Sequence, residues 1–250
     1  MPVNARWAVA LSAGVLAGLA ALVARGEPPP LDARLSVRGG SLPAAQRASA
    51  ALARIPARFA PARVRLEQRP ILGVECERET GSLLLGNSAV ELPDSVWLHE
   101  LAHVRMHGAR PQAPLAQRVL TAFEEGVADH YAAVFSGSPR LGFGAEQRDL
   151  RQPPSLGPSD WASLAFPSFD PHRMGWGLAA ALYAAEPRAG ALLETALACL
   201  DGTGPLAEAD TPARAISSLL ASCPESGKQR MRDVLNDWLP PAFLNESSPP

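Results

Sequence analysis

Residues 94–108 read DSVWLHELAHVRMHG, and this stretch decides the fold. It contains two histidines four residues apart, His99 and His103, with Glu100 directly after the first. The polar start after a proline and the apolar spacing predict a helix. Histidines at positions i and i+4 share one face of a helix, so both imidazoles can reach a single ion. Glu100 is expected beside them, where a carboxylate can take a proton from a water held by that ion.

A second helix, expected at residues 113–135, carries the sequence FEEGVAD at 123–129. Glu125 and Asp129 are four residues apart and share a face, so one carboxylate can bind the metal while the other fixes the tautomer of a ligand histidine. Glu124 competes with Glu125 as ligand, and the Glu-x-x-x-Asp spacing favours Glu125. Small residues around them are expected to let this helix approach the first one closely: Ala122, Gly126, Ala128, Ala132 and Ala133.

An HExxH motif followed by Glu-x-x-x-Asp in the next helix resembles the gluzincin metallopeptidases, the thermolysin-like branch of the zincins. The resemblance covers residues 82–133. It implies a zinc ion held by His99, His103 and Glu125, with Asp129 behind His99 as a supporting carboxylate. Other zincin branches fit worse, because the pattern of the metzincins requires a glycine and a further histidine that the sequence lacks at the matching positions.

The resemblance also implies a reaction and a substrate. Glu100 is expected to deprotonate the attacking water and to deliver the proton to the leaving amine, which would make the chain a hydrolase of peptide bonds. A strand of the sheet, expected at residues 82–92, would align an extended peptide or protein substrate along its edge.

A hydrolase of this kind also needs a donor for the oxygen of the attacked carbonyl. His172 is the first candidate, because it opens a downstream helix and gluzincins often supply a histidine or tyrosine from such a helix. An ordinary surface position for His172 stays equally open, and Tyr183 and Tyr131 are the alternatives. His107 and His130 are expected to be exposed or packing residues.

The N-terminal segment predicts export. An uninterrupted apolar run covers residues 7–24, with one arginine before it and a Pro-rich stretch after it. Residues 1–26 are therefore expected to be a signal peptide or a membrane anchor, and both readings stay open. Either one places the rest of the chain outside the cytoplasm, as a secreted, periplasmic or membrane-tethered domain. The net charge of −2 gives no electrostatic reason to expect nucleic acid.

Export changes how the cysteines are interpreted. Cys199 and Cys223 lie near the ends of two consecutive helical patterns, and an oxidising compartment would permit them to pair. Cys76 is then left over, and we expect it to be a small, buried hydrophobic residue in a strand.

The 250 residues and 47% hydrophobic content suit one globular domain with a targeting segment. We expect an α+β, zincin-like fold in which a small mixed sheet packs on the HExxH helix and the C-terminal half is mostly helical. The expected divisions are a linker at 27–41, the metallopeptidase domain at 42–244 and a tail at 245–250.

Further helices are predicted at 42–59, 172–185, 189–200, 211–222 and 229–238. Strands are predicted at 64–66, 71–77 and 82–92, Asp94 is the expected N-cap of the HExxH helix, and a long surface loop is predicted at 140–171.

The sequence thus predicts an exported zinc-dependent peptidase. Two other functions remain open. One is an exported zinc-binding protein whose site is non-catalytic or serves a single partner. The other is a surface interaction module in which the motif is fortuitous, which would bind no metal.

Overall fold

The computed structural model describes residues 30–39, 41–106, 114–142, 144, 147–166, 169–201 and 211–240. The expected signal or anchor at 1–26, the expected tail at 245–250 and His107 lie outside these residues. The chain divides into two compact units, Met1–Ala33 and Arg34–Pro250. The helices and strands of the described residues belong to the second unit.

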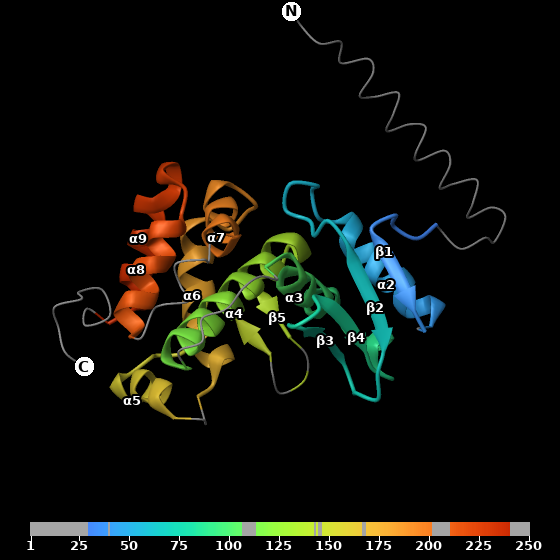
Figure 1. Ribbon diagram of the computed structural model, residues 1–250, viewed down its shortest axis with the longest axis horizontal. Helices are drawn as coiled ribbons and strands as arrows, with labels where there is room; N and C mark the ends of the chain where they lie inside the picture. Colours follow the sequence, from blue (N-terminus) through green and yellow to red (C-terminus); the bar gives the residue numbers. More distant parts are fainter. Residues whose placement is uncertain are drawn as a thin grey trace, which may run out of the picture. The chain divides into compact units, whose positions relative to one another are not determined.

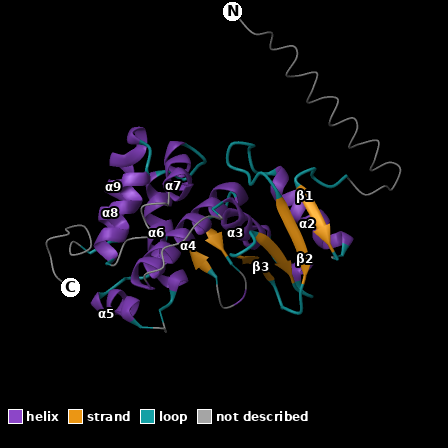
Figure 2. Ribbon diagram, in the orientation of Figure 1, coloured by secondary structure: helices purple, strands orange, loops and turns teal. Residues whose placement is uncertain are grey.

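The second unit is an α+β structure built around a four-stranded mixed sheet. The strands are β1 (Leu35–Arg38), β2 (Val64–Gln68), β3 (Val74–Glu77) and β4 (Ser82–Leu85), and their order in the sheet is β1-β2-β4-β3. β1 and β2 run parallel, as do β2 and β4, whereas β3 and β4 are antiparallel. Figure 2 shows these strands gathered next to the helices α2 and α3. The predicted mixed sheet on the HExxH helix is confirmed.

The edge strand beside the HExxH helix is β3 and not the segment 82–92, so this expectation was wrong. β4 ends at Leu85 and lies between β2 and β3, so neighbouring strands use its backbone groups on both sides. Gly86 then lies against the backbone of Ile71, where an added Cβ would clash with the carbonyl group, and a short 3-10 helix follows at Ala89–Glu91. The chain therefore leaves the sheet at a position that only glycine can occupy.

The HExxH helix is α3 (Asp94–Arg105), and it packs on α2 (Leu42–Ala53). The prediction that Asp94 caps α3 was wrong, because the preceding proline is the cap residue and Asp94 belongs to the first turn. Its carboxylate pairs instead with Arg47 of α2 at 3.1 Å and with Arg54, the C-cap residue of α2, at 2.6 Å. A negative charge in the first turn of a helix is favourable, so the residue still stabilises the start of α3.

The C-terminal half is mostly helical, as predicted, and α4 (Pro114–Ser136) is its central element. Residues 122–133 of α4 are all buried, which is typical of a helix surrounded by other elements. It contacts α3 on one side and α6, α7 and α8 on the other, an arrangement that Figure 1 shows. The remaining helices follow close to their predicted ranges: α6 (Pro171–Ala185), α7 (Ala191–Asp201), α8 (Pro212–Ser222) and α9 (Glu225–Trp238).

Two glycines bring α4 and α6 into direct contact. A Cβ on Gly175 would lie 2.7 Å from the Cβ of Glu125 and 2.9 Å from the carbonyl oxygen of Ala122, and a Cβ on Gly126 would lie 2.8 Å from the carbonyl oxygen of Gly175. The small residues of α4 were expected to admit the HExxH helix, but at Ala122 and Gly126 the helix they admit is α6. This contact brings the N-terminal part of α6 next to Glu125.

The predicted surface loop at 140–171 contains short elements. These are β5 (Arg140–Leu141), which pairs with β6 (Arg148–Asp149), the helix α5 (Pro158–Ala162) and a short 3-10 helix at Ser163–Ala165. Strands of two residues and a helix of five are too short to produce a hydrophobic period, so the composition of the segment concealed them.

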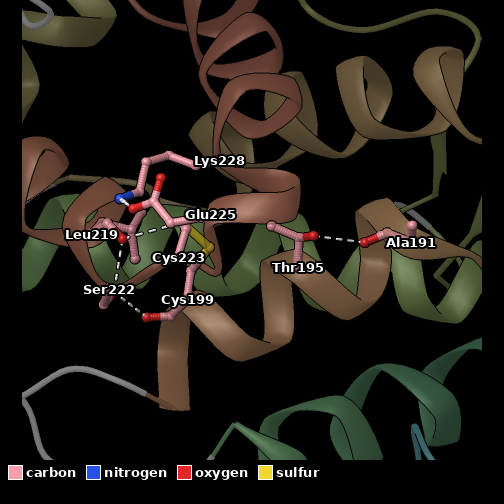
Figure 3. The surroundings of a disulfide bond; sticks show 8 residues. All are labelled: Ala191, Thr195, Cys199, Leu219, Ser222, Cys223, Glu225 and Lys228. Atoms are coloured by element: carbon pink, nitrogen blue, oxygen red, sulfur yellow. Dashed lines mark hydrogen bonds and ion pairs between the residues drawn. A yellow bond between two sulfur atoms is a disulfide. The ribbon is translucent and has the colours of Figure 1, made fainter.

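Cys199 and Cys223 form a disulfide, which joins the end of α7 to the end of α8 (Figure 3). Ser222 donates a hydrogen bond of 2.6 Å to the carbonyl oxygen of Cys199 beside it. Cys76 lies in β3 and is partly buried. A structural disulfide suits an oxidising compartment outside the cytoplasm. Within the described residues, no helix is long and apolar enough to span a membrane, and the apolar run at 7–24 is not among them.

Candidate metal centre

Three buried side chains from two helices meet at one point. His99 and His103 come from α3, and Glu125 comes from α4. The Nε2 atoms of the two histidines are 3.1 Å apart, and Oε2 of Glu125 lies 3.2 Å from each of them. The structure therefore assembles two imidazole nitrogens and one carboxylate oxygen into a compact triangle.

The triangle fits a metal ion. In a tetrahedral site, a metal–ligand distance of about 2.0–2.1 Å places neighbouring ligand atoms about 3.3–3.4 Å apart. The three observed separations, 3.1 to 3.2 Å, are close to this spacing. Imidazole and carboxylate donors suit several transition ions, so the group can hold a metal without itself specifying which one. Glu124, the rival ligand, is not part of the triangle.

Asp129 contacts the first histidine, the residue that it was expected to support. Its Oδ1 atom lies 2.8 Å from Nδ1 of His99, on the side of the ring opposite to the triangle. A carboxylate in this place fixes the proton on Nδ1 and leaves Nε2 for the metal. Asp129 in turn contacts Arg148 of β6, whose Nε atom lies 3.3 Å from Oδ2 of Asp129. Sequence reasoning missed Arg148, which lies in the segment predicted to be a surface loop.

Without a metal, the pKa values of His99 and Glu125 in the triangle are strongly shifted. Burial lowers the pKa of His99, but the hydrogen bonds with Asp129 and Glu125 outweigh this effect and raise the pKa to about 10. Burial also raises the pKa of Glu125, yet the charge and hydrogen bond of His103, together with His172 and His99, hold that pKa well below its usual range. In the absence of a metal, a proton on His99 therefore partly balances the buried carboxylates, and a metal ion that binds His99 has to replace a proton.

Glu100 lies between the two histidines on α3 and is partly buried. Its Oε2 atom accepts a 2.7 Å hydrogen bond from the backbone N–H of Cys76 in β3. The edge strand thus passes directly beside Glu100, and its backbone holds the carboxylate in one orientation.

His172 lies at the start of α6, and its Nδ1 atom is 3.1 Å from Oε2 of Glu125. Its side chain is 53% exposed, so the ring lies at the boundary between the buried triangle and solvent. The two tyrosines considered as alternatives lie elsewhere. Tyr131 is buried and donates a hydrogen bond to the carbonyl oxygen of Phe59. Tyr183 is eleven residues further along α6 than His172, which separates them by about 16 Å along the helix axis.

Arg78 is the second residue that sequence reasoning missed. It follows the last residue of β3, and its Nη2 atom lies 2.6 Å from Oε1 of Glu125. Its Nη1 atom lies 3.6 Å from Oε2 of Glu124, which is also buried. The signal in the sequence is an arginine in a run of glutamates, ECERE at 75–79.

His130 is a packing residue of α4, one of the two roles expected for it. Its side chain is completely buried, and burial lowers its pKa to about 4 against the opposing charge of Asp129. The ring is therefore neutral near pH 7 and lies outside the metal-binding triangle.

A scan against protein-family models and searches of curated proteins and of solved structures found no match. The resemblance to gluzincins therefore rests on the residues of the site and their arrangement.

Proposed function

We propose that this protein is an exported zinc metallopeptidase that hydrolyses peptide or protein substrates. The observation that carries the proposal is the buried group of His99, His103 and Glu125 with Glu100 beside it. Three protein ligands and one remaining position are typical of catalytic zinc sites, whereas structural sites are closed by four protein ligands. When bound, a zinc ion supplies a Lewis acid, which activates a water molecule and polarises a carbonyl group.

Glu100 is the proposed general base. It takes a proton from the attacking water and delivers it to the nitrogen of the leaving amine. The hydrogen bond from the backbone of Cys76 supports this role, because it orients the carboxylate without using a second side chain. Glu100 is also outside the group of metal-binding side chains, so it remains available for proton transfer.

His172 is the proposed donor to the carbonyl oxygen as that oxygen gains negative charge. Its half-exposed ring, 3.1 Å from Glu125, lies where a substrate entering from solvent would meet the site.

The strand β3 is the proposed guide for the substrate. It hydrogen-bonds to β4 on one side, and its other side faces α3 and Glu100. An extended peptide can add to such an edge as a further strand, which would carry its backbone past the metal centre. The short length of β3, four residues, favours recognition of a short stretch of the substrate.

The test is cleavage of an unbiased peptide library by the zinc-loaded protein, compared with the variant Glu100→Gln. Glutamine keeps the size of the side chain but cannot accept the proton, so we expect the parent to cut and the variant to leave the peptides intact. If neither protein cuts, although both are folded and bind one zinc ion, the peptidase assignment is wrong.

One observation favours a second function, an exported zinc protein with a non-catalytic or single-partner site. Nδ1 of His172 lies as near to Oε2 of Glu125 as the two ligand histidines do. If His172 moved onto the metal, it would provide a fourth protein ligand and close the site, as in structural zinc centres. X-ray absorption of the zinc-loaded protein separates the two cases, because it counts the imidazole ligands. Two imidazoles leave a position open, whereas three mean that His172 binds the metal.

A further inference from the structure

Arg78 connects the edge strand to the metal centre through a forked set of contacts. Its Nη2 atom lies 2.6 Å from Oε1 of Glu125. Its Nη1 atom lies 3.4 Å from the hydroxyl of Thr121 and 3.6 Å from Oε2 of Glu124. The three contacted residues all belong to α4, so one guanidinium holds one face of that helix at the level of the metal-binding group.

With this contact, the two carboxylate oxygens of Glu125 have different partners. Oε1 lies on Arg78, whereas Oε2 is the atom that approaches His99, His103 and His172. The last torsion of a glutamate rotates broadly, so the backbone does not by itself decide which oxygen faces the histidines. Arg78 supplies the missing constraint.

Arg78 also balances charge. Glu124 and Glu125 are adjacent in sequence, and each residue is only 3% exposed. Burying two carboxylates side by side is unfavourable unless a cation accompanies them. Arg78 contacts both, and its planar fork can serve two acceptors at fixed angles, which a lysine ammonium does not reproduce.

We propose that Arg78 is a positioning residue of the metal centre: it holds Glu125 by Oε1 so that a single oxygen, Oε2, is presented as the metal ligand. This proposal rests on the proposed metal site. It adds a requirement that the HExxH and Glu-x-x-x-Asp motifs do not contain, because Arg78 directly follows β3, which precedes both motifs in the chain. The end of β3 would then support the metal ligand, and its backbone supports Glu100.

The test compares three variants of the full chain. Arg78→Met removes the charge and the fork but keeps much of the apolar stem, and Arg78→Lys keeps the charge alone. Arg65→Met is the matched control, because Arg65 is an exposed arginine on β2 of the same sheet. Two quantities are measured on each protein: the dissociation constant for zinc, from competition with a chelator, and the visible spectrum of the cobalt-loaded form.

We expect Arg78→Met to weaken zinc binding about 10–100-fold, the usual effect of removing a residue that orients a metal ligand. Its cobalt spectrum should also change, because Glu125 can then turn or offer both oxygens. Arg78→Lys should recover part of the affinity but not the parent spectrum, and Arg65→Met should match the parent in both. A folded Arg78→Met protein with the affinity and spectrum of the parent would overturn the proposal. If that variant does not fold, Arg78→Lys decides, and parent values in both measurements overturn it.

These measurements need no peptide substrate, so they separate this inference from the proposed function. A parent that binds zinc but cuts no peptide contradicts the peptidase assignment and leaves the role of Arg78 to be judged from the variants. A parent that cuts peptides, together with an Arg78→Met variant of unchanged zinc affinity and spectrum, contradicts the role of Arg78 alone. A parent that binds no zinc contradicts both.

Discussion

His99 and His130 are both buried in the described structure, yet their pKa values move in opposite directions. His99 has Asp129 and Glu125 as partners, and its pKa rises to about 10. No carboxylate is recorded as a hydrogen-bond partner of His130 in the part of the chain described, and burial lowers its pKa to about 4. Near pH 7 the His99 ring is therefore protonated in the metal-free protein, whereas the His130 ring is neutral. The difference arises from the partners of each ring, since both residues are buried.

These shifts predict how the stability of the metal-free protein depends on pH. The pairing of charged His99 contributes stability that is complete below the unfolded pKa of 6.5 and is lost as pH rises through about 10. Neutral His130 acts at the other end, because its contribution is present above pH 6.5 and is lost as pH falls towards 4. The free energy of unfolding should therefore be largest near pH 6.5.

Urea unfolding in the presence of a chelator, repeated across this pH range, measures the profile. The variant His130→Leu should remove the decline that His130 causes on the acid side and leave the decline on the alkaline side. A free energy of unfolding that stays constant from pH 6.5 to pH 10 would contradict the charged state assigned to His99.

Among the elements, the pair α4 and α6 positions the site most tightly. The close approach at Gly126 and Gly175 lies beside Glu125, and α6 carries His172 to the same point. At Gly175 the neighbouring atoms are the Cβ of Glu125 and backbone atoms of α4, which cannot swing aside as the end of a flexible side chain can. The separation of the two helix axes is therefore coupled to the position of Glu125.

The substitution Gly175→Ala should disturb both stability and metal binding. Its new methyl group would lie 2.7 Å from Glu125 Cβ, so α6 has to move away, at a cost of about 1–3 kcal/mol for overpacking. Gly73→Ala is the matched control, because its Cβ would meet only Leu92 Cδ1 at 3.7 Å, an ordinary contact. Thermal unfolding and zinc titration of both variants measure the effect, and equal values for the two would show that α6 does not position Glu125.

The long helices could be predicted from the sequence, and the short elements could not. Apolar residues recur at helical spacing through α4, α6 and α7, so a local pattern places them. β1 was not predicted, because none of its residues is buried and three of its four are exposed, which leaves no alternation to detect. The helix predicted to reach residue 59 ends at Ala53, since Pro56 follows closely and disfavours helical conformation before it.

At the scale of the whole molecule, the triangle of His99, His103 and Glu125 joins two parts of the second unit. α3 packs on the sheet and on α2, whereas α4 packs on the helices of the C-terminal half. His99 and His103 come from the first part and Glu125 from the second. An ion bound there would connect the two parts by direct coordination, in addition to the apolar contacts between α3 and α4.

Removal of the metal should therefore destabilise the whole domain. At a free zinc concentration of about 1,000 times the dissociation constant, binding adds about 4 kcal/mol to the free energy of unfolding. The unfolding temperature should fall when a chelator is added and should return when zinc is restored in excess. The variant Glu125→Ala should unfold at the same temperature with and without zinc. If zinc stabilises this variant as much as the parent, the ion binds elsewhere.

The sequence by itself was enough to predict that His99 and His103 would meet, with Glu100 between them in the chain, and how Glu125 relates to Asp129, because positions four apart on a helix share a face whatever surrounds it. The pattern of helices and strands, together with the resemblance of the motifs to gluzincins, also predicted the class of the fold. Only the tertiary structure decided that β3 is the edge strand beside the site, that α6 rather than α3 meets the small residues of α4 at Gly126, and that Arg78 contacts Glu125 and Arg148 contacts Asp129. The physical reason is that strand order and contacts between helices depend on residues far apart in the chain, and no local spacing records which of them will meet.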